Sequence, residues 1–287
     1  MIIFKRLHAT RYILKTILSH ATRYILYAVL IFFVGCAAPP EKPTGEYIWP
    51  LPPETPRIKW LTEWSSRYDF KKPNPLLTFL IGEERVERFR RPNGVVADST
   101  GNVYAADSEL RLIFVFDQEK KGLRFLGEGT LAGPIGLAID NKRGIIFVSD
   151  SRFDKVFGLD KNTGKVVMSM GAPGEFNNPS GMVFDEERDR LYVADTKNHI
   201  VRVFDRDGRP LFKIGQRGNS DGEFNFPSYL AFRNGRLYVV DSFNFRVQIF
   251  DSEGNFLKKF GRLGDASGFF SRPNGIGVDS EGHVYVV

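Results

Sequence analysis

A short pattern recurs five times in this chain at nearly constant spacing. Each copy opens with a proline at the start of an apolar segment, and the prolines lie 42, 45, 48 and 46 residues apart by subtraction of their positions. The five openings are Pro92-Asn93-Gly94, Pro134-Ile135-Gly136, Pro179-Ser180-Gly181, Pro227-Ser228-Tyr229 and Pro273-Asn274-Gly275. A period of this length is typical of arrays of supersecondary units, so it constrains the fold more than any single motif does.

Each repeat has the pattern of a four-stranded antiparallel sheet. The third repeat contains four short apolar segments: Met182–Phe184, Leu191–Ala194, Ile200–Phe204 and Pro210–Ile214. Asp207-Gly208 in this repeat and Asn234-Gly235 in the next are dipeptides that favour tight hairpin turns, because such turns need positive φ. A single small sheet cannot cover its own apolar faces, whereas sheets stacked around an axis cover one another. The repeats therefore predict an all-β fold, a β-propeller.

Two further features recur with the repeats, and we interpret both as structural. An aspartate closes the second strand of each complete copy, and its carboxylate can accept N–H groups of the following loop. These residues are Asp107, Asp150, Asp195 and Asp241. A large apolar residue stands three positions before each proline, where we expect it to plug the space between neighbouring blades. These residues are Phe89, Leu131, Phe176, Phe224 and Phe270.

Residues 89–287 resemble the NHL-repeat propellers. The fourth repeat matches the family pattern best, with Val239-Val240-Asp241 followed by Asn244 and Arg246, whereas the third repeat has Ile200 where the family has arginine. The resemblance implies a six-bladed β-propeller of four-stranded antiparallel blades. It does not specify a function, because this fold supports enzymes, RNA-binding proteins and protein scaffolds.

The repeats account for about four and a half blades, so we expect a ring that is truncated at the C-terminus of this sequence. Residues 92–287 form the repeats, and we expect residues 57–91 to supply closing strands. Candidate strands are Ile58–Trp64 and Leu76–Gly82, and a short helix over Pro75–Ile81 is the alternative for the second.

The first 35 residues differ in composition from the rest of the chain. They carry five basic and no acidic residues, and Tyr24–Val34 is an apolar run of eleven residues. A bilayer span needs about 20 residues, so this run suits the core of a secretory signal instead. The signal ends in Phe33-Val34-Gly35-Cys36, which resembles a bacterial lipoprotein cleavage box with Cys36 as the lipidated residue. The alternative is an uncleaved anchor in which Cys36 is inert.

The predicted cellular location follows from this cleavage motif. Residues 36–56 would be the lipidated cysteine and a proline-rich spacer, and Ala37 after the cysteine implies, by resemblance, the outer membrane with the protein facing the periplasm. Without the five leader bases the chain has 35 basic and 34 acidic residues, a net charge of +1. This balance argues against a nucleic-acid partner. We expect a membrane association through the lipid and a protein partner in the cell envelope.

The residues offer little support for catalysis. Related propellers include, by resemblance, a zinc lyase with histidine ligands and calcium lactonases. Of the four histidines here, His8 and His20 belong to the leader, and His199 and His283 both stand at turns. We therefore expect no catalytic residues, no metal site and no cofactor, and a non-catalytic binding scaffold as the function. The alternative is a metal-dependent lyase or lactonase with its site in the central channel, where oxygen ligands could hold calcium.

Departures from the repeat suggest where a ligand binds. Tyr229 replaces a glycine of the other copies and Arg233 replaces an aspartate, and both belong to an inner strand close to the central channel. The loops between second and third strands also carry basic and aromatic residues, which suit a protein partner or an anionic one. The candidate binding residues there are Arg152, Phe153, His199, Phe243 and Phe245, with Arg111 and Lys197 beside them. The alternative is that all of these are ordinary solvated loop residues.

Overall fold

The computed structural model describes residues 47–51, 53, 55–66, 69–70 and 88–287. The chain divides into two compact units, residues 1–62 and residues 63–287. The predicted signal, Cys36 and the candidate segments Leu76–Gly82 and Pro75–Ile81 lie outside the described residues. The part of the chain that is described contains no helix with the length and hydropathy needed to cross a bilayer.

The second unit is built from four sheets of four antiparallel strands and one smaller sheet. Blade 1 contains β3 (Pro92–Ala97), β4 (Val103–Asp107), β5 (Leu112–Asp117) and β6 (Gly122–Leu126). Blade 2 contains β7 (Pro134–Asp140), β8 (Ile145–Asp150), β9 (Lys155–Asp160) and β10 (Val166–Met170). Blade 3 contains β11 (Pro179–Asp185), β12 (Arg190–Asp195), the 3-10 helix η2 (Thr196–Asn198), β13 (Ile200–Asp205) and β14 (Pro210–Ile214). Blade 4 contains β15 (Pro227–Arg233), β16 (Arg236–Asp241), the 3-10 helix η3 (Ser242–Asn244), β17 (Arg246–Asp251) and β18 (Phe256–Phe260). The last sheet has two strands, β19 (Ile276–Val278) and β20 (Val284–Val286).

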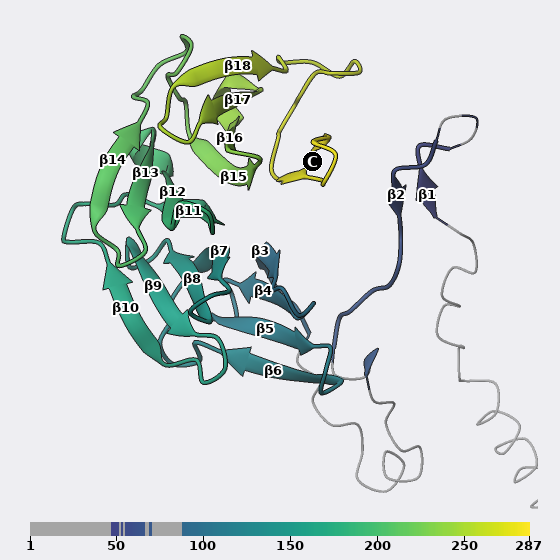
Figure 1. Ribbon diagram of the computed structural model, residues 1–287, viewed down its shortest axis with the longest axis vertical. Coiled ribbons are helices and arrows are strands. Elements are labelled where there is room, and N and C mark those ends of the chain that lie inside the picture. The colour runs from purple at the N-terminus through teal and green to yellow at the C-terminus, as the bar shows by residue number, and fades with distance from the viewer. Residues whose placement is uncertain (1–46, 52, 54, 67–68, 71–87) are drawn as a thin grey trace, which may run out of the picture. The chain divides into compact units, whose positions relative to one another are not determined.

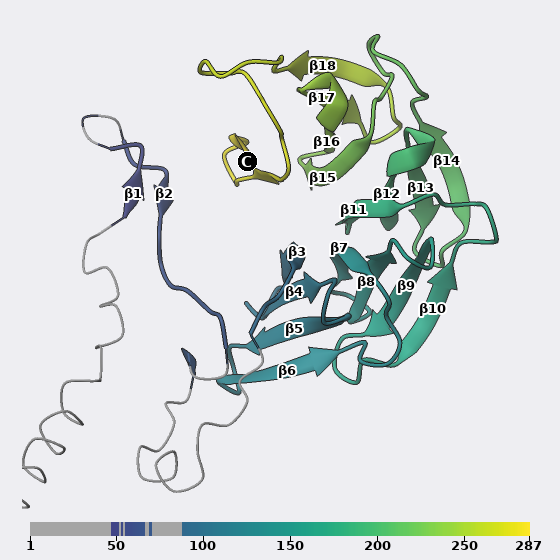
Figure 2. The same ribbon diagram turned by 180° about the vertical axis from the view of Figure 1, so that it is seen from behind.

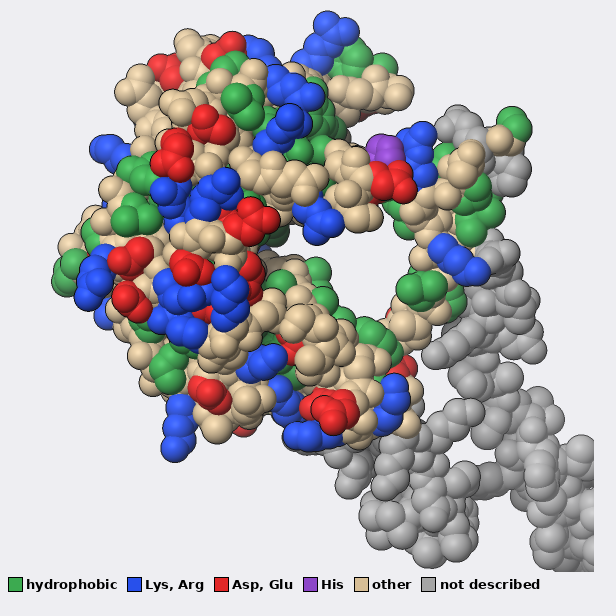
Figure 3. Space-filling model, viewed as in Figure 1, with side chains coloured by type: hydrophobic (Ala, Val, Ile, Leu, Met, Phe, Trp, Pro, Cys, Tyr) green, Lys and Arg blue, Asp and Glu red, His purple; other side chains and the backbone are tan. Residues whose placement is uncertain are grey.

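The blades are arranged around a common axis (Figures 1 and 2). In every complete blade the strands are paired in chain order, and the first strands β3, β7, β11 and β15 lie innermost. The space-filling view shows an open hollow beside these inner strands, with acidic and basic side chains interspersed over the surrounding face (Figure 3). This arrangement confirms the predicted all-β propeller of four-stranded blades.

Strand positions and turns follow the predicted pattern closely. In blade 3, β12 pairs with β13 in unbroken register from Arg190↔Asp205 to Asp195↔Ile200. Asn234 and Gly235 both have positive φ, 50° and 70°, and form the two-residue turn between the paired residues Arg233 and Arg236. A two-residue turn with positive φ at both central positions is a type I′ turn, and Asn-Gly is the dipeptide that adopts it most readily.

The recurring aspartates do more than cap the loops that follow them. Asp107 Oδ1 accepts the N–H groups of Glu109 and Leu110 at 3.0 and 2.9 Å, while Oδ2 accepts those of Arg90 and Arg91 at 2.7 and 2.9 Å. Burial opposes ionisation of Asp107, but these N–H donors outweigh it and lower the pKa of the carboxyl. Each carboxylate thus ties the linker before its blade to the loop after its second strand, which confirms a structural role.

The arginine missing from the third repeat is replaced from another position. Ile200 stands where the fourth repeat has Arg246, whose Nε donates to Asp241 Oδ2 at 2.8 Å. In blade 3 the Nε of Arg202 donates to Asp195 Oδ2 at 2.7 Å instead. Since alternate residues of a strand share a face, a donor two positions along β13 reaches the same carboxylate.

The apolar residues before the prolines of blades 2 to 4, Leu131, Phe176 and Phe224, plug the gaps between blades, as predicted. Phe176 and Phe224 are both buried, and their rings lie 5.7 Å from Phe204 and 5.5 Å from Phe250. Phe224 packs in one cluster with Ile214 of blade 3 and with residues of blade 4. The core of the propeller is therefore a series of inter-blade clusters.

Glycines set how closely the inner strands approach one another. A Cβ placed on Gly94 would lie 2.5 Å from the Ile135 carbonyl oxygen, and one on Gly136 would lie 2.1 Å from that of Ser180. A Cβ on Gly181 would lie 2.4 Å from the carbonyl oxygen of Ser228. Backbone carbonyls cannot retreat as flexible side chains can, so neighbouring inner strands meet here main chain to main chain.

The first unit contains a small hairpin. β1 (Ile48–Trp49) pairs with β2 (Ile58–Lys59), and the rings of Tyr47 and Trp60 lie 6.2 Å apart. The sequence predicted a strand over Ile58–Trp64 and a role in closing the ring. The structure pairs only Ile58–Lys59, and the partner is β1. The closing role of residues 57–91 stays a prediction.

Residues at the start of the second unit cover blade 1. The Trp64 ring lies 5.6 Å from that of Phe116 and stacks on it, and Phe70 lies 6.2 Å from the same ring. Phe89 lies 4.3 Å from Phe114. These aromatic side chains cover β5, against which the described residues place no preceding blade.

A buried carboxylate in blade 1 leads to an expectation about acid stability. Burial opposes ionisation of Asp98, but donors from Thr100 (2.7 Å), Lys161 (3.1 Å) and Asn102 outweigh it and hold the pKa of the carboxyl well below its usual range. A depressed pKa stabilises the fold above the unfolded value of about 3.9 and loses that contribution as pH falls toward the folded value.

We therefore expect the free energy of unfolding to fall steeply below about pH 4, and Asp98→Asn to flatten that fall. Urea denaturation of both proteins between about pH 2 and 6 measures the free energy of unfolding as a function of pH. Asp265→Asn, on an exposed side chain, is the matched control and should keep the wild-type slope. An Asp98→Asn profile that parallels the wild type would exclude this carboxylate as a source of acid sensitivity.

Candidate functional site

The loops between second and third strands lie at one end of the propeller. In blades 1 to 4 the proline that starts the inner strand pairs with the aspartate that ends the second strand, as in Pro92↔Asp107 and Pro227↔Asp241. The loops after these aspartates therefore lie beside the start of the inner strands. We call residues 108–111, 151–154, 196–199 and 242–245 the loop face.

Two phenylalanines of the loop face are exposed to solvent. Phe153 is 51% and Phe243 61% exposed, although both belong to a residue type that is usually buried. Phe153 meets Phe157 edge to face at 6.1 Å, and Phe243 lies 4.8 Å from Phe226. Each ring thus packs against another phenylalanine and still exposes part of its surface to solvent. Aromatic residues that a binding partner buries at the centre of an interface have this arrangement.

His199 is part of the scaffold beneath this surface. It is buried, its ring lies 4.5 Å from that of Phe226, and its Nδ1 accepts the N–H of Phe226 at 3.2 Å. Burial lowers the pKa of His199, with Arg217 adding to the effect. A neutral imidazole whose Nδ1 is already occupied supports Phe226, and through it Phe243.

Phe245 occupies a special backbone position. Its φ is 53°, and the equivalent residues Arg111, Asp154 and His199 also have φ between 50° and 60°. The N–H of Phe245 donates to the Ser242 carbonyl at 3.3 Å, which closes the one-turn helix η3. No sequence signal marks these left-handed residues, because none of them is glycine.

Tyr229 lies on the wall of the central channel. A cavity of about 390 Å³ is bordered by residues of all five sheets of the second unit, and Tyr229 lines it together with Asn93, Asn274 and Met182. Burial raises the pKa of the Tyr229 phenol. The departure from the repeat at this position therefore places a large, partly desolvated side chain where the other blades have glycine.

Arg233 does not join the loop-face residues. β15 runs from Pro227, beside the loop face, to Arg233, which is exposed at its far end next to the Asn234-Gly235 turn. Seven residues of strand separate these ends by roughly 20 Å. The aspartates at the equivalent position of blades 1 to 3, Asp98, Asp140 and Asp185, are buried and paired, for example Asp140 with Arg143 at 2.9 Å. The sequence grouped Arg233 with Tyr229, but only Tyr229 borders the channel cavity.

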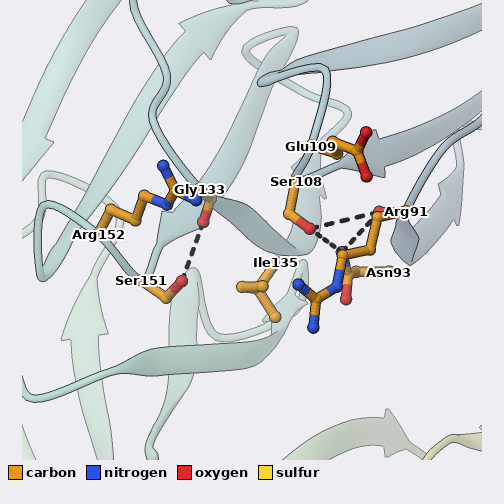
Figure 4. Close-up of a pocket in the computed structure, with 8 residues that line it drawn as sticks. All are labelled: Arg91, Asn93, Ser108, Glu109, Gly133, Ile135, Ser151 and Arg152. Atoms are coloured by element: carbon orange, nitrogen blue, oxygen red, sulfur yellow. Dashed lines mark hydrogen bonds between the residues drawn. The ribbon is translucent and has the colours of Figure 1, made fainter.

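A second cavity opens between blades 1 and 2 on the loop-face side (Figure 4). Its volume is about 220 Å³, and its lining residues are Arg91, Asn93, Ser108, Glu109, Gly133, Ile135, Ser151 and Arg152. Arg152 was predicted as a binding residue, whereas Arg91 was not. In the sequence, Arg91 is marked only by its position directly before the repeat proline Pro92. The fold shows that this position lies beside the loop after β8 of the next blade.

Potential metal ligands are scattered. The described residues contain no group of three or more His, Cys, Asp or Glu side chains placed to hold a metal ion. His199 packs in blade 3, and His283 lies 2.9 Å from Asp279 in the turn before β20. Cys36 lies outside the described residues.

Comparison with known proteins identifies the repeat. The family model described as NHL repeat matches residues 176–204. The chain is 32% identical over 111 residues to NHL repeat-containing protein 2 of Homo sapiens, covering 33% of this chain and 15% of that protein. It is 30% identical over 155 residues to a probable peptidyl-alpha-hydroxyglycine alpha-amidating lyase of Caenorhabditis elegans, covering 50% of this chain and 40% of that protein. This chain thus spans less than half the length of either relative.

Solved structures agree on the fold. A streptogramin B lyase has a TM-score of 0.56 with 16% identity, over 68% of this chain and 61% of that one. Identity at this level supports a propeller architecture and nothing about chemistry.

The comparisons correct one expectation. Catalysis was excluded because the sequence holds no histidine cluster, but the sequence is similar to an amidating lyase over half the chain. The exclusion was wrong, since absence of a recognisable ligand motif does not separate this chain from propellers that are enzymes.

Proposed function

Because this chain carries an NHL repeat within an NHL-type β-propeller, we propose that it binds a polypeptide on its loop face. The observation that carries the proposal is the pair of exposed, supported rings, Phe153 and Phe243, on loops of different blades. Aromatic residues supply much of the binding energy of interfaces when a partner desolvates them.

Electrostatics favour an acidic partner. The loop face carries three cations, Arg111, Arg152 and Lys197, against two acidic residues, Glu109 and Asp154, and Arg91 lines the same cavity as Arg152. Exposed cations around apolar anchors increase the rate of association with acidic surfaces and make it sensitive to salt.

The double variant Phe153→Ala with Phe243→Ala tests the surface. Losing an anchor at an interface costs about 2 kcal/mol or more, so we expect affinity for the partner to fall at least thirtyfold. Crosslinking with full-length protein in its own cells, followed by affinity measurement on the captured polypeptide, gives the readout. The matched control is Leu211→Ala with Val167→Ala, exposed apolar residues on outer strands. Equal loss in both variants would remove the loop face from consideration.

The similarity to an amidating lyase favours a second candidate function. A peptidyl-α-hydroxyglycine breaks down when its N–Cα bond is cleaved and the hydroxyl proton moves to the amide nitrogen, giving a peptide amide and glyoxylate. Incubating the full chain with N-benzoyl-α-hydroxyglycine and measuring glyoxylate tests this chemistry. Release no faster than with heat-denatured protein would count against it.

We also propose that the propeller is lipid-anchored at Cys36 and faces the periplasm from the outer membrane. The lipobox-like Phe33-Val34-Gly35-Cys36 after an apolar run supports this address. We expect Cys36→Ser to abolish labelling with radioactive palmitate and to prevent signal cleavage. Unchanged labelling of that variant would contradict the anchor.

A further inference from the structure

We propose that the cavity between blades 1 and 2 binds the carboxylate of a peptide, with Arg91 and Arg152 as its recognition residues. This inference rests on the proposed function, since it assigns a chemical group to the polypeptide that the loop face would bind. Both arginines line the same cavity of about 220 Å³, one from the linker before blade 1 and one from the loop after β8 (Figure 4).

The charge in this cavity is unbalanced. Glu109 is the only acidic residue among the eight that line it, and its Oε1 already lies 3.4 Å from Arg90 Nη1. Within the described residues, the guanidinium groups of Arg91 and Arg152 have no carboxylate partner. Guanidinium groups bind carboxylates through paired, charge-assisted hydrogen bonds, so an anionic group is the complementary ligand.

The repeat does not require these arginines. The residue before each proline is Arg91, Gly133, Asn178, Phe226 or Arg272, and the second residue after each aspartate is Glu109, Arg152, Lys197 or Phe243. The blade 2–3 junction therefore combines Gly133 with Lys197, and the blade 3–4 junction combines Asn178 with Phe243. Among the junctions of the complete blades, the first alone has an arginine at both of these positions, and both line one cavity, which points to a ligand and not to blade packing.

The rest of the lining is ordered and partly apolar. Asn93 Nδ2 donates to Ser108 Oγ and to the Arg91 carbonyl, both at 2.9 Å, which holds the linker that carries Arg91. The Ser151 N–H donates to the Gly133 carbonyl at 2.9 Å, next to Arg152. Ile135 supplies an apolar wall at a position where the other repeats have Asn or Ser.

This combination suits a carboxylate with an apolar group beside it. Such a group occurs at a peptide's free C-terminus after an apolar residue, or in an acidic side chain beside one. Three probes separate these sources: N-acetyl-Phe-Leu as the free acid, the same peptide as its C-terminal amide, and N-acetyl-Asp-Phe amide.

Calorimetric titration of the full chain with each probe tests the site. We expect at least one acid to bind at least tenfold more tightly than the amide, and the preferred acid identifies the source. Arg91→Ala and Arg152→Ala should each weaken acid binding about tenfold or more, as expected for lost hydrogen bonds to a charged group. Arg272→Ala, at the position equivalent to Arg91 in the fifth repeat, and Lys258→Ala, on the outer strand β18, are the controls and should bind as the wild type does.

Binding of acid and amide with equal affinity, or binding of neither acid at millimolar concentration, would overturn the carboxylate site. Equal weakening in the control variants would overturn the assignment to Arg91 and Arg152. None of these results affects the partner assay with Phe153→Ala and Phe243→Ala, so failure of this site is distinguishable from failure of the proposed function. Circular dichroism of each variant checks that the propeller is folded.

Discussion

Replacing Asp241 with alanine is expected to lower the free energy of unfolding by about 3–5 kcal/mol. The carboxylate is fully buried and accepts the N–H of Asn225 at 2.7 Å, Asn244 Nδ2 and Arg246 Nε at 2.8 Å, and Gln248 Nε2 at 3.2 Å. Its loss leaves the buried Arg246 guanidinium without its counter-charge and frees the linker before blade 4.

Equilibrium denaturation with urea measures this loss. Asp265→Ala, on an exposed side chain, is the control and should change stability by less than about 0.5 kcal/mol. The double variant Asp241→Ala with Arg246→Ala shows whether the unpaired arginine charge causes most of this loss. If it does, the double variant should lose less unfolding free energy than the two single variants lose in sum. A cost below about 1 kcal/mol for Asp241→Ala would contradict the structural role of the repeated aspartates.

Phe224→Ala is expected to cost a similar amount, about 3–5 kcal/mol, through the cavity it leaves between blades 3 and 4. The ring is fully buried, and a Cβ placed on Gly215 would lie 2.4 Å from it, which shows how tightly it is held. Phe224→Leu keeps much of the volume and should lose less.

Phe243→Ala is the matched control for this position, because its ring is largely exposed and belongs to the same blade. We expect that variant to keep wild-type stability in the same denaturation experiment. If Phe224→Ala were as mild as Phe243→Ala, the blades would not depend on the linker side chains for cohesion.

Strand positions were predictable because their signals are local. Asn234-Gly235 and the apolar run after it specify a turn and a strand from adjacent residues alone. The role of the repeated aspartates was predictable in part. Their bonds to the following loop follow from sequence, whereas the bond from the Asn225 N–H to Asp241 joins residues 16 positions apart.

Features that depend on contacts between blades were harder to predict. Arg202 replaces the missing arginine of the third repeat from a different strand position, which a fixed motif cannot anticipate. Arg91 and Arg152 share a cavity although 61 positions separate them, so neither is conspicuous in the sequence. Arg233 was assigned to the channel because it departs from the repeat, but the length of β15 places it at the opposite end from Pro227.

The glycine contacts between inner strands have a consequence for how such a ring can diversify. Gly94, Gly136 and Gly181 contact the main chain of the neighbouring inner strand directly. Backbone atoms, and not side chains, therefore set the distance between these blades near the axis. Side chains elsewhere on the inner strands and loops can then be exchanged without altering the radius of the ring. Evolution can therefore vary ligand chemistry at the axis and the loop face separately from the architecture, and one blade geometry can serve unrelated activities.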